Sequence, residues 1–435
     1  MVISGQHQAR DKSTGSGVGR PRRLKILFVE PEATGHHMAS YLRQICSEAA
    51  GRGWELHLLT TRDAMAHPAF SAVQVACGGT LGVHRMRRGD GGAGRQNPAW
   101  LLAMQLRQFR ALWFGFRQVL EAVVPDVVYV NDLGQCDKAM ALLGSPFGAA
   151  PLVGMLFSIR FHYHEVGVVA PHRGRDRILR LLFHRLLGTK TLRAVLSNDP
   201  SLAEFADRGY FNCWEKIIVV PELGTVSGAV SREEARRHLG IGDQQVVVLL
   251  YGSLERRKGL SELLRAVADT ACPQNVVVVI AGQRNGGFED CSSGEWLASL
   301  KDQERIVELR GFLDEEAEAR CFRAADVVWL GYRGFYAISG VLIQAATVGA
   351  PVLSCLEGVV GWMVRRHGLG LSVDVAQQSE VVSALRRLAS DAKLRGTLGA
   401  NGKALAARHS PQGFGVRVCD AIGRAADLLL RHQYS

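Results

Sequence analysis

The sequence predicts an α/β protein made of two consecutive units of parallel α/β architecture. Short apolar runs with the length of buried strands alternate along the chain with longer segments of helical periodicity, as is typical of parallel sheets covered by helices. The turn-rich segment Pro221–Gly228 interrupts this alternation near the middle of the chain. The chain has 435 residues, which is enough for two domains of about 200 residues each.

The first unit is expected over residues 24–222, with its strands at short apolar segments. These segments are Leu24–Glu30, Trp54–Thr60, Asp126–Asn131, Leu152–Phe157 and Ala194–Ser197. A helix is expected from Met38 to about Arg52, where apolar residues recur at helical spacing. Parallel sheets bind ligands at the carboxyl ends of their strands, so the polar residues that follow these strands are candidates for binding.

The second unit is expected over residues 223–415 and repeats the same alternation. Its strands are predicted at Val246–Tyr251, Val276–Ala281, Ile306–Leu309, Val327–Leu330 and Pro351–Ser354. The apolar segment Asp420–Leu430 predicts a terminal helix within residues 416–435, which could return to the first unit.

The charge and hydropathy of the chain limit its partners. The formal net charge of +11 favours an acidic partner, such as nucleic acid, anionic lipid or a phosphorylated substrate. No zinc finger or RNP-type aromatic motif accompanies the basic residues, so we expect no nucleic acid partner. No apolar run approaches the roughly 18 to 20 residues of a membrane span. A solvated basic surface without a specific partner is the alternative interpretation.

The N-terminus and the cysteines favour a cytoplasmic protein. Residues 1–23 are polar and basic and lack the apolar core of a secretory signal, so we expect a disordered tail there. The nine cysteines are scattered singly, without a C-x-x-C pair. This distribution fits a reducing compartment and argues against a disulfide framework or structural zinc.

Candidate ligand-binding residues fall in five segments. The first is the strand-to-helix turn Glu30–His37 (EPEATGHH), in which Gly35 allows close approach of the backbone to a ligand. His36 and His37 lie at the expected start of the helix. They are either acceptor-side residues or polar capping residues without chemistry.

The second segment is Tyr251–Gly259 (YGSLERRKG), a strand end followed by a basic loop. Gly252 and Ser253 lie at the strand end, and Arg256, Arg257 and Lys258 follow in the loop. Cations at this point would suit a phosphorylated or other anionic ligand. A solvated basic turn is the alternative.

The remaining segments also follow strands. Gly282 and Gln283 lie in Val276–Gly287 (VVVVIAGQRNGG), and Gly311 and Phe312 lie in Arg310–Asp326 (RGFLDEEAEARCFRAAD). In the fifth, Tyr336–Val352 (YAISGVLIQAATVGAPV), Ser339 and Gly340 are expected to open a helix. Its free N–H groups and dipole would favour an anion.

In this order the five segments resemble the GT-B glycosyltransferases, above all the large retaining family four (glycosyl transferases group 1). The resemblance covers residues 24 to 430 and is more specific in the second half. It implies two Rossmann-like domains that face each other across a cleft, with the acceptor in the first and a nucleotide sugar in the second. It implies retaining transfer from a nucleoside diphosphate sugar to a saccharide, lipid-linked or small-molecule acceptor, with no cofactor beyond that substrate.

The resemblance also assigns roles to the donor-side residues. Lys258 matches the family lysine that faces the diphosphate, whereas Ser253 stands where the family has arginine, and Arg256 or Arg257 could supply that charge. The helix start at Ser339 and Gly340 would face the same diphosphate. The turn at Gly311 and Phe312 would contact the base, and Gly252, Gly282 and Gln283 would approach the donor.

Two residues depart from the family pattern. Tyr336 and Gln344 replace the two family glutamates, of which the second accepts hydrogen bonds from ribose hydroxyls. Gln344 can still accept through its amide oxygen, but without charge. Tyr336 cannot replace a carboxylate, which leaves donor identity and catalytic competence open.

The first domain offers acceptor-side candidates at Asn131 and Asp132 and in the segment Phe161–Glu165 (FHYHE). The family often has a histidine in this region, and His162 is the favoured catalytic candidate, with His164 and Glu165 on the acceptor side. For each histidine, an ordinary loop position is the alternative. The sequence has no Asp-x-Asp motif, so the resemblance implies no metal dependence.

Two amphipathic segments suggest contact with an anionic membrane on its inner face. Arg173–Arg193 interleaves arginines with leucine and phenylalanine, and Trp100–Val124 contains three clustered aromatic residues. Alternatively, both segments pack their apolar faces into the first domain.

Two further functions remain open. The missing glutamates also suit a non-catalytic GT-B-like protein that binds a ligand or a partner. A sugar-nucleotide epimerase of the same fold would need carboxylates in the cleft.

Overall fold

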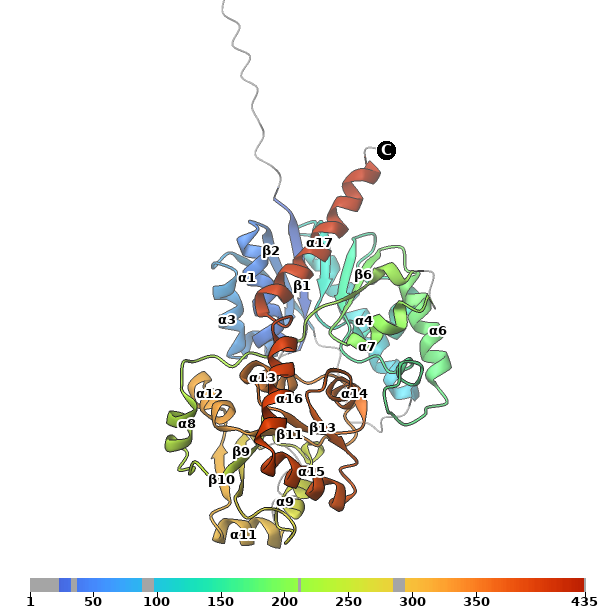
Figure 1. Ribbon diagram of the computed structural model, residues 1–435. Helices are drawn as coiled ribbons and strands as arrows, with labels where there is room; N and C mark the ends of the chain where they lie inside the picture. The colour runs from blue at the N-terminus through green and yellow to red at the C-terminus, as the bar shows by residue number, and fades with distance from the viewer. Residues whose placement is uncertain (1–22, 33–36, 88–97, 210–212, 285–293, 434–435) are drawn as a thin grey trace, which may run out of the picture.

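The computed structural model describes residues 23–32, 37–87, 98–209, 213–284 and 294–433. Within them the chain forms two parallel sheets, each covered by helices (Figure 1). The first sheet has seven strands in the order β3-β2-β1-β4-β5-β6-β7, and the second has six in the order β10-β9-β8-β11-β12-β13. The predicted α/β architecture of two Rossmann-like domains is confirmed. Gly35, His36 and the predicted N-terminal tail lie outside the described residues, except for its last residue, Arg23.

The first sheet contains every strand that the sequence predicts for it, and two more. Its strands are β1 (Lys25–Glu30), β2 (Glu55–Thr61), β3 (Leu81–Met86), β4 (Val127–Val130), β5 (Leu152–Met155), β6 (Leu192–Ser197) and β7 (Ile217–Val219). The two strands missed, β3 and β7, lie at the edges of the sheet. Both are only partly buried along most of their length, so neither carries the continuous apolar run of an inner strand.

Alternate residues of β1 reach opposite faces of the first sheet. Leu27 and Val29 pack with α4 (Pro98–Leu120), α5 (Asp137–Leu143) and α6 (Asp176–Leu187). Ile26 and Phe28 instead pack with the π-helical turn η1 (His37–Leu42), with α1 (Arg43–Gly51) and with α3 (Ala69–Ala76). Helix α2 (Arg62–Ala66) follows β2, and α7 (Pro200–Ala206) follows β6. Short 3-10 turns lie at η2 (Leu133–Gln135), η3 (Tyr163–Val166) and η4 (Trp214–Lys216).

The second sheet lies in the other half of the molecule (Figure 1). Its strands are β8 (Val246–Tyr251), β9 (Val276–Gly282), β10 (Ile306–Arg310), β11 (Val327–Leu330), β12 (Val352–Cys355) and β13 (Gly370–Val373). Its helices and turns are α8 (Arg232–His238), η5 (Arg256–Lys258), α9 (Leu260–Val267), α11 (Glu295–Asp302), α12 (Glu315–Ala324), α13 (Gly340–Val348), α14 (Gly358–His367), α15 (Gln378–Ser390) and α16 (Ala392–Ala406). Among these strands, only the half-buried edge strand β13 is not predicted by the sequence.

The last helix, α17 (Pro411–Gln433), lies across the first domain (Figure 1). It is longer than the predicted helix Asp420–Leu430, and its buried Phe414, Val418 and Ile422 join the core that contains β1 and α1. The chain therefore crosses between the two domains twice, once before α8 and once before α17.

A loop of the first domain also contacts the second domain directly. The Tyr163 hydroxyl donates to the Tyr336 carbonyl at 3.0 Å, and Trp362 Nε1 of α14 donates to the Val166 carbonyl at 3.0 Å. The Gly358 amide donates to the Val169 carbonyl at 2.8 Å. These bonds hold the two domains together beside the carboxyl ends of the second sheet.

Both segments for which the sequence suggests membrane contact contain a helix, α6 and α4, and each helix buries one face. Phe183, Leu186 and Leu187 of α6 are buried in the first domain, as are Leu112 and Phe116 of α4. None of the described helices has both the length and the apolar character that crossing a bilayer requires.

Candidate active site

Strands β8 and β9 end where their backbones touch. Gly282 at the end of β9 has φ +137°, and a Cβ atom there would lie 1.9 Å from the carbonyl oxygen of Gly252. Gly252 follows β8 and has φ +107°. Only glycine fits this contact at Gly282, because any side chain would overlap backbone and adopt a disfavoured φ. The two predicted donor-side glycines are thus in backbone contact at the carboxyl ends of β8 and β9 and form the floor of the candidate site.

Lys258 lies directly above this floor. Its side chain is buried, with 5% of the residue exposed, and it ends the 3-10 turn Arg256–Lys258. Nζ donates to the Tyr251 carbonyl at 2.9 Å and to the Tyr332 hydroxyl at 3.3 Å. Neither partner is charged, and no carboxylate of the described residues forms an ion pair with Lys258. A buried ammonium in this setting favours an anionic ligand, which would supply the missing opposite charge.

Helix α13 begins beside the lysine. Its N-cap residue Ser339 uses its hydroxyl to contact the Tyr332 hydroxyl at 2.9 Å and makes no capping bond to α13. The first amides of the helix therefore keep their capacity to donate to an anion. A Cβ on Gly252 would lie 4.0 Å from the Val341 side chain and 3.3 Å from Lys258 Nζ. The structure thus brings Lys258, Gly252, Ser339 and Gly340 together.

The arginines of the basic loop differ in their surroundings. Arg257 Nε donates to Glu255 at 2.7 Å, and its guanidinium lies 4.8 Å from the centre of the Phe335 ring. Ser253 donates to the same carboxylate at 2.8 Å. Burial acts to raise the pKa of Glu255, but the bonds from Arg257 and Ser253 lower it below its usual value. Glu255 therefore neutralises part of the Arg257 charge, whereas Arg256 is exposed.

The predicted base-side residues line the neighbouring strand ends. The Gly311 amide donates to the Gly282 carbonyl at 3.2 Å, and the Gln283 carbonyl accepts from the Leu254 amide at 2.7 Å. Phe312 follows Gly311 and is 91% exposed. An exposed aromatic ring next to the strand ends is suited to stacking on a planar base.

The two residues that replace the family glutamates lie at either end of this site. The Tyr336 ring is buried under the guanidinium of Arg160, 4.6 Å away. Burial, and then the charge of Glu357, raise the pKa of Tyr336. Gln344 is half-buried on α13, and its amide donates to the Thr225 carbonyl at 3.4 Å. Sequence reasoning did not single out Tyr332, Arg160 or Glu357, because their contacts come from other segments.

A second polar cluster lies at the carboxyl ends of β1 and β4. The strand order reverses between these strands, and such a point is the usual ligand-binding crevice of an open parallel sheet. Asn131 donates to Glu30 at 2.6 Å, and the Asp132 side chain accepts from the Gly134 amide at 2.8 Å. Burial raises the pKa of Glu30 to about 7 and that of Asp132 to about 6. Asn131 and Asp132 were candidates from the sequence, and Glu30 is a new one.

His162 contacts residues other than those of this cluster. His162 is fully buried among aromatic rings, and its Nε2 shares a hydrogen bond with Ser201 at 2.9 Å. Burial lowers the pKa of His162 to about 3, so its ring is neutral at pH 7. This setting favours the ordinary alternative of a core histidine, and its catalytic role stays a prediction.

The acceptor-side candidates His164 and Glu165 have structural partners of their own. His164 stacks on His172 with ring centres 3.7 Å apart, and Glu165 pairs with Arg180 at 2.9 Å. His37 opens η1. Among the described residues no group of three or more His, Cys, Asp or Glu side chains could hold a metal ion.

Comparison with solved structures gives the class of protein. Anabaena HepE, solved with UDP and glucose, has a TM-score of 0.63 at 18% identity, covering 92% of this chain and 100% of HepE. Sucrose-phosphate synthase from Thermosynechococcus elongatus has a TM-score of 0.65 at 17% identity, covering 94% and 100%. Together with the two facing domains, these similarities define a GT-B fold, as the sequence predicts.

Sequence comparison finds a family model and curated relatives that match part of the chain. Residues 231–405 match the family of glycosyl transferases group 1. The D-inositol 3-phosphate glycosyltransferase of Corynebacterium jeikeium is 32% identical over 185 residues, which are 41% of this chain and 44% of that protein. The same enzyme of Stackebrandtia nassauensis is 27% identical over 257 residues, 56% of each chain. The chain spans about half the length of these curated relatives, and residues 231–405, within its second domain, are the part that matches the family model. The predicted resemblance is confirmed.

Proposed function

We propose that the protein is a retaining glycosyltransferase that moves a sugar from a nucleoside diphosphate sugar to an acceptor. One observation carries this proposal: Lys258 Nζ and the first turn of α13 meet through the Tyr332 hydroxyl, at 3.3 Å from Nζ and 2.9 Å from Ser339 Oγ. The lysine supplies a buried positive charge and the helix supplies amide donors. Both suit the diphosphate that departs from a donor sugar.

In the proposed chemistry, the main contribution of the protein is to stabilise the leaving diphosphate through Lys258 and the first amides of α13. As the glycosidic bond breaks, negative charge grows on the departing diphosphate, and donors that are already in place stabilise it. The departing phosphate takes the proton of the acceptor hydroxyl on the same face of the sugar, so the configuration is retained. Because Lys258 and α13 carry the charge, we propose that the reaction needs no metal ion. The loss of one such donor costs about 3 to 4 kcal/mol in comparable sites.

A uridine nucleotide is the first donor to test. The solved structures of Anabaena HepE contain UDP, or UDP-glucose, and share the fold of this chain at 18% identity. In this protein Phe312 offers an exposed ring for the base, and the Gln344 amide oxygen is the candidate acceptor for ribose hydroxyls.

The acceptor is proposed to bind at the first sheet, beside Glu30, Asn131 and Asp132. These side chains lie at the point where the strand order reverses, and they carry carboxyl and amide groups of the kind that bond to hydroxyls. The curated relatives are named as glycosyltransferases of D-inositol 3-phosphate, a small polyol phosphate. A polyhydroxylated small molecule, a saccharide or its lipid-linked form fits this chemistry.

We also propose that the protein works in the cytoplasm and docks on anionic membranes. Helix α6 exposes Ile178 and Leu181, each 61% exposed, between Arg177 and Arg185. Helix α4 packs on the same face of the first sheet and exposes Trp113 and Phe114. Helices that expose both apolar and cationic side chains bind anionic bilayers. A lipid-linked acceptor would then be within reach.

Ligand binding and turnover of a matched pair of variants test the proposal. UDP or UDP-glucose should raise the melting temperature of the wild-type protein through mass action. Lys258→Ala should lower donor turnover by about 100- to 1,000-fold. Lys393→Ala, which removes an exposed lysine from α16, is the control and should leave turnover unchanged.

The outcomes also separate the alternatives. Donor binding without transfer or hydrolysis would favour the non-catalytic binding protein, for which the buried Tyr336 in place of a carboxylate is the motivating observation. Isomerised nucleotide sugar in the absence of any acceptor would favour the epimerase. Full turnover by Lys258→Ala would overturn the electrostatic role that we give to the lysine.

A further inference from the structure

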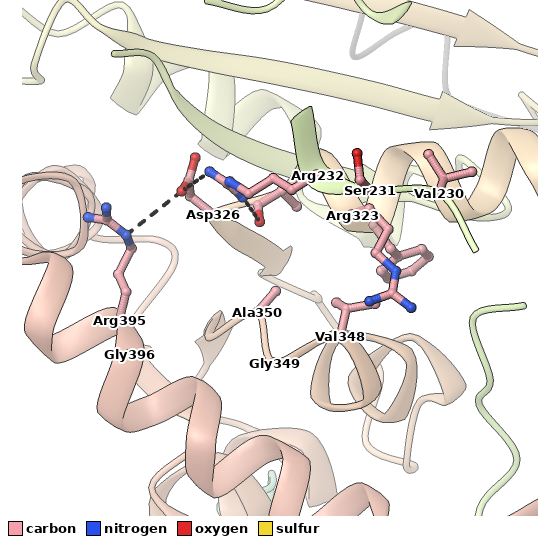
Figure 2. Close-up of a pocket in the computed structure, with 12 residues that line it drawn as sticks. Val230, Ser231, Arg232, Arg323, Asp326, Val348, Gly349, Ala350, Arg395 and Gly396 are labelled. Carbon is pink, nitrogen blue, oxygen red and sulfur yellow. Dashed lines mark hydrogen bonds and ion pairs between the residues drawn. The ribbon is translucent and has the colours of Figure 1, made fainter. Parts of the chain in front are cut away.

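A pocket lies at the amino ends of the strands of the second sheet, opposite the end that carries the proposed donor site. It has a volume of about 310 Å³ and is open to solvent between α12, α16 and the end of α13 (Figure 2). Asp326 and Ala350 line it, just before β11 and β12 begin. Lys258 and Ser339 lie beyond the carboxyl ends of the strands, so this pocket is distinct from the proposed donor site. Its volume is in the range of small-molecule sites, roughly 300 to 1,000 Å³.

Arginines dominate the charge of this pocket. Arg232, Arg323 and Arg395 line it, against a single acid, Asp326. Asp326 is already occupied, because Oδ1 accepts from Arg232 at 2.6 Å and Oδ2 accepts from Arg236 at 3.2 Å. The Val247 amide also donates to Oδ2, at 2.8 Å. The Asp326 carboxylate therefore links α8 to the start of β8 and β11. Because the pocket has three lining arginines and one carboxylate, its lining carries a net positive charge.

Arg323, unlike Arg232 and Arg395, makes no ion pair with Asp326. Its Nε atom is shielded from solvent, and among the described residues it has no hydrogen-bond partner. Its guanidinium ends beside Val348, across the pocket from Arg395 (Figure 2). The Arg323 guanidinium also makes no ion pair among the described residues, so its positive charge is available to an anion bound in the pocket.

Arg395 approaches from the opposite wall. Its Nη1 donates to the carbonyls of Leu388 at 2.6 Å and Ala389 at 3.0 Å, and Nε lies 3.9 Å from Asp326. These bonds tie one end of the guanidinium to the last turn of α15. The lining also includes the apolar residues Val230, Phe322, Val348 and Ala350. The pocket thus joins cationic walls to an apolar floor.

We propose that this pocket binds a small organic phosphate, with Arg323 and Arg395 on the phosphate group and the apolar floor under its organic part. Guanidinium groups match the geometry of phosphate oxygens and stay charged at any physiological pH. The apolar floor distinguishes an organic phosphate from a free phosphate ion, which would leave that surface uncovered. The proposal does not depend on the reaction at Lys258.

Calorimetric titration with glucose 1-phosphate and, separately, with inorganic phosphate tests the site. Both are titrated into the full chain carrying Lys258→Ala, so that the proposed donor site does not contribute. Glucose 1-phosphate should bind, inorganic phosphate should bind more weakly, and binding of both should weaken as salt is added. Arg323→Gln should weaken binding of glucose 1-phosphate by about tenfold or more, since a bond to a charged group is lost.

Arg237→Gln is the matched control, because it removes an equal charge from the exposed face of the nearby helix α8. It should leave the affinity unchanged. Arg323 makes no ion pair among the described residues, so Arg323→Gln should fold normally, and unchanged melting temperatures would verify this. The proposal is overturned if neither probe binds, if Arg323→Gln binds glucose 1-phosphate as tightly as its parent, or if Arg237→Gln weakens binding equally. Equal affinity for the two probes would overturn the role of the apolar floor.

Discussion

The Nζ atom of Lys258 lies 3.3 Å from the hydroxyl oxygen of Tyr332. The same hydroxyl lies 2.9 Å from Ser339 Oγ, so one side chain joins the basic loop after β8 to the start of α13. The Tyr332 ring also lies under the ammonium, with 4.9 Å between Nζ and the ring centre. Tyr332 therefore fixes the distance between the two parts of the proposed diphosphate site without needing to touch the substrate.

Tyr332→Phe should lower turnover more than it lowers donor affinity. The ring stays and keeps its contact with the ammonium, but Lys258 and Ser339 lose their shared partner. We expect kcat to fall by about tenfold and KM for the donor to change by less, because the charge remains but its position is less well fixed. Thr347→Val is the control, since it removes a hydroxyl from the far end of α13. Equal losses in kcat for the two variants would contradict a positioning role for Tyr332.

Gly282→Ala should destabilise the protein severely. Its φ of +137° is unfavourable for alanine, and the new Cβ would lie 1.9 Å from the Gly252 carbonyl oxygen, which is backbone and cannot rotate away. We expect a loss of at least about 3 kcal/mol in the free energy of unfolding, measured by urea denaturation. At Gly51 in α1 a Cβ would meet nothing within 4 Å. Gly51→Ala should therefore be neutral or stabilising by up to about 1 kcal/mol, and similar midpoints for the two variants would show that the close contact is absent.

Most of the strands that the sequence predicts correctly are buried on both faces, and the half-buried edge strand β10 is the exception. Val246–Tyr251 and Val276–Gly282 are almost continuously buried, so their apolar runs are visible without any knowledge of the fold. Strand β3 has the sequence LGVHRM and is mostly half-buried. Its pairing with β2 at the edge of the sheet, rather than a local apolar pattern, defines it as a strand.

The same reasoning explains what could be predicted of the site. Lys258 and Ser339 occupy recognisable positions in strand-to-helix turns, so the sequence of each turn is enough to suggest a role for them. Tyr332 lies between two such segments, and its contacts depend on how they pack. His162 was attractive because histidine is reactive, but its partners Ser201 and Asp199 come from another segment and bury it in the core.

Replacement of the exposed apolar residues of α6 should abolish membrane binding and leave folding intact. Ile178 and Leu181 are each 61% exposed, so the double variant Ile178→Ser, Leu181→Ser removes little core packing. We expect the wild-type protein to sediment with vesicles containing anionic lipid at low salt, and the variant to stay in the supernatant. Val75→Ser is the control, because Val75 is 79% exposed on α3, which covers the opposite face of the sheet. Wild-type protein that remains in the supernatant at low salt would refute docking by this helix.

The linker residue Glu222 predicts how stability depends on pH. It is buried where the domains join: Tyr41 donates to Oε1 at 2.6 Å, Asn198 donates to Oε2, and the Glu222 amide donates to His409 at 3.0 Å. Burial raises the pKa of Glu222 from 4.5 to about 7, despite the bonds from Tyr41 and Asn198 that act to lower it. The folded protein therefore holds this proton more tightly than the unfolded chain does.

It follows that the stabilisation from protonated Glu222 is complete below about pH 4.5 and is lost as the pH rises through about 7. The shift corresponds to a loss of about 3 kcal/mol across this window. Glu222→Gln should remove that part of the slope and be more stable than wild type at pH 8, as measured by urea denaturation at a series of pH values. Some slope should remain, because Glu30 titrates in the same window. The control is Glu233→Gln, at an exposed position of α8, which should keep the wild-type dependence of the free energy of unfolding on pH. If Glu222→Gln also kept that dependence, Glu222 would already be ionised in the folded protein at low pH.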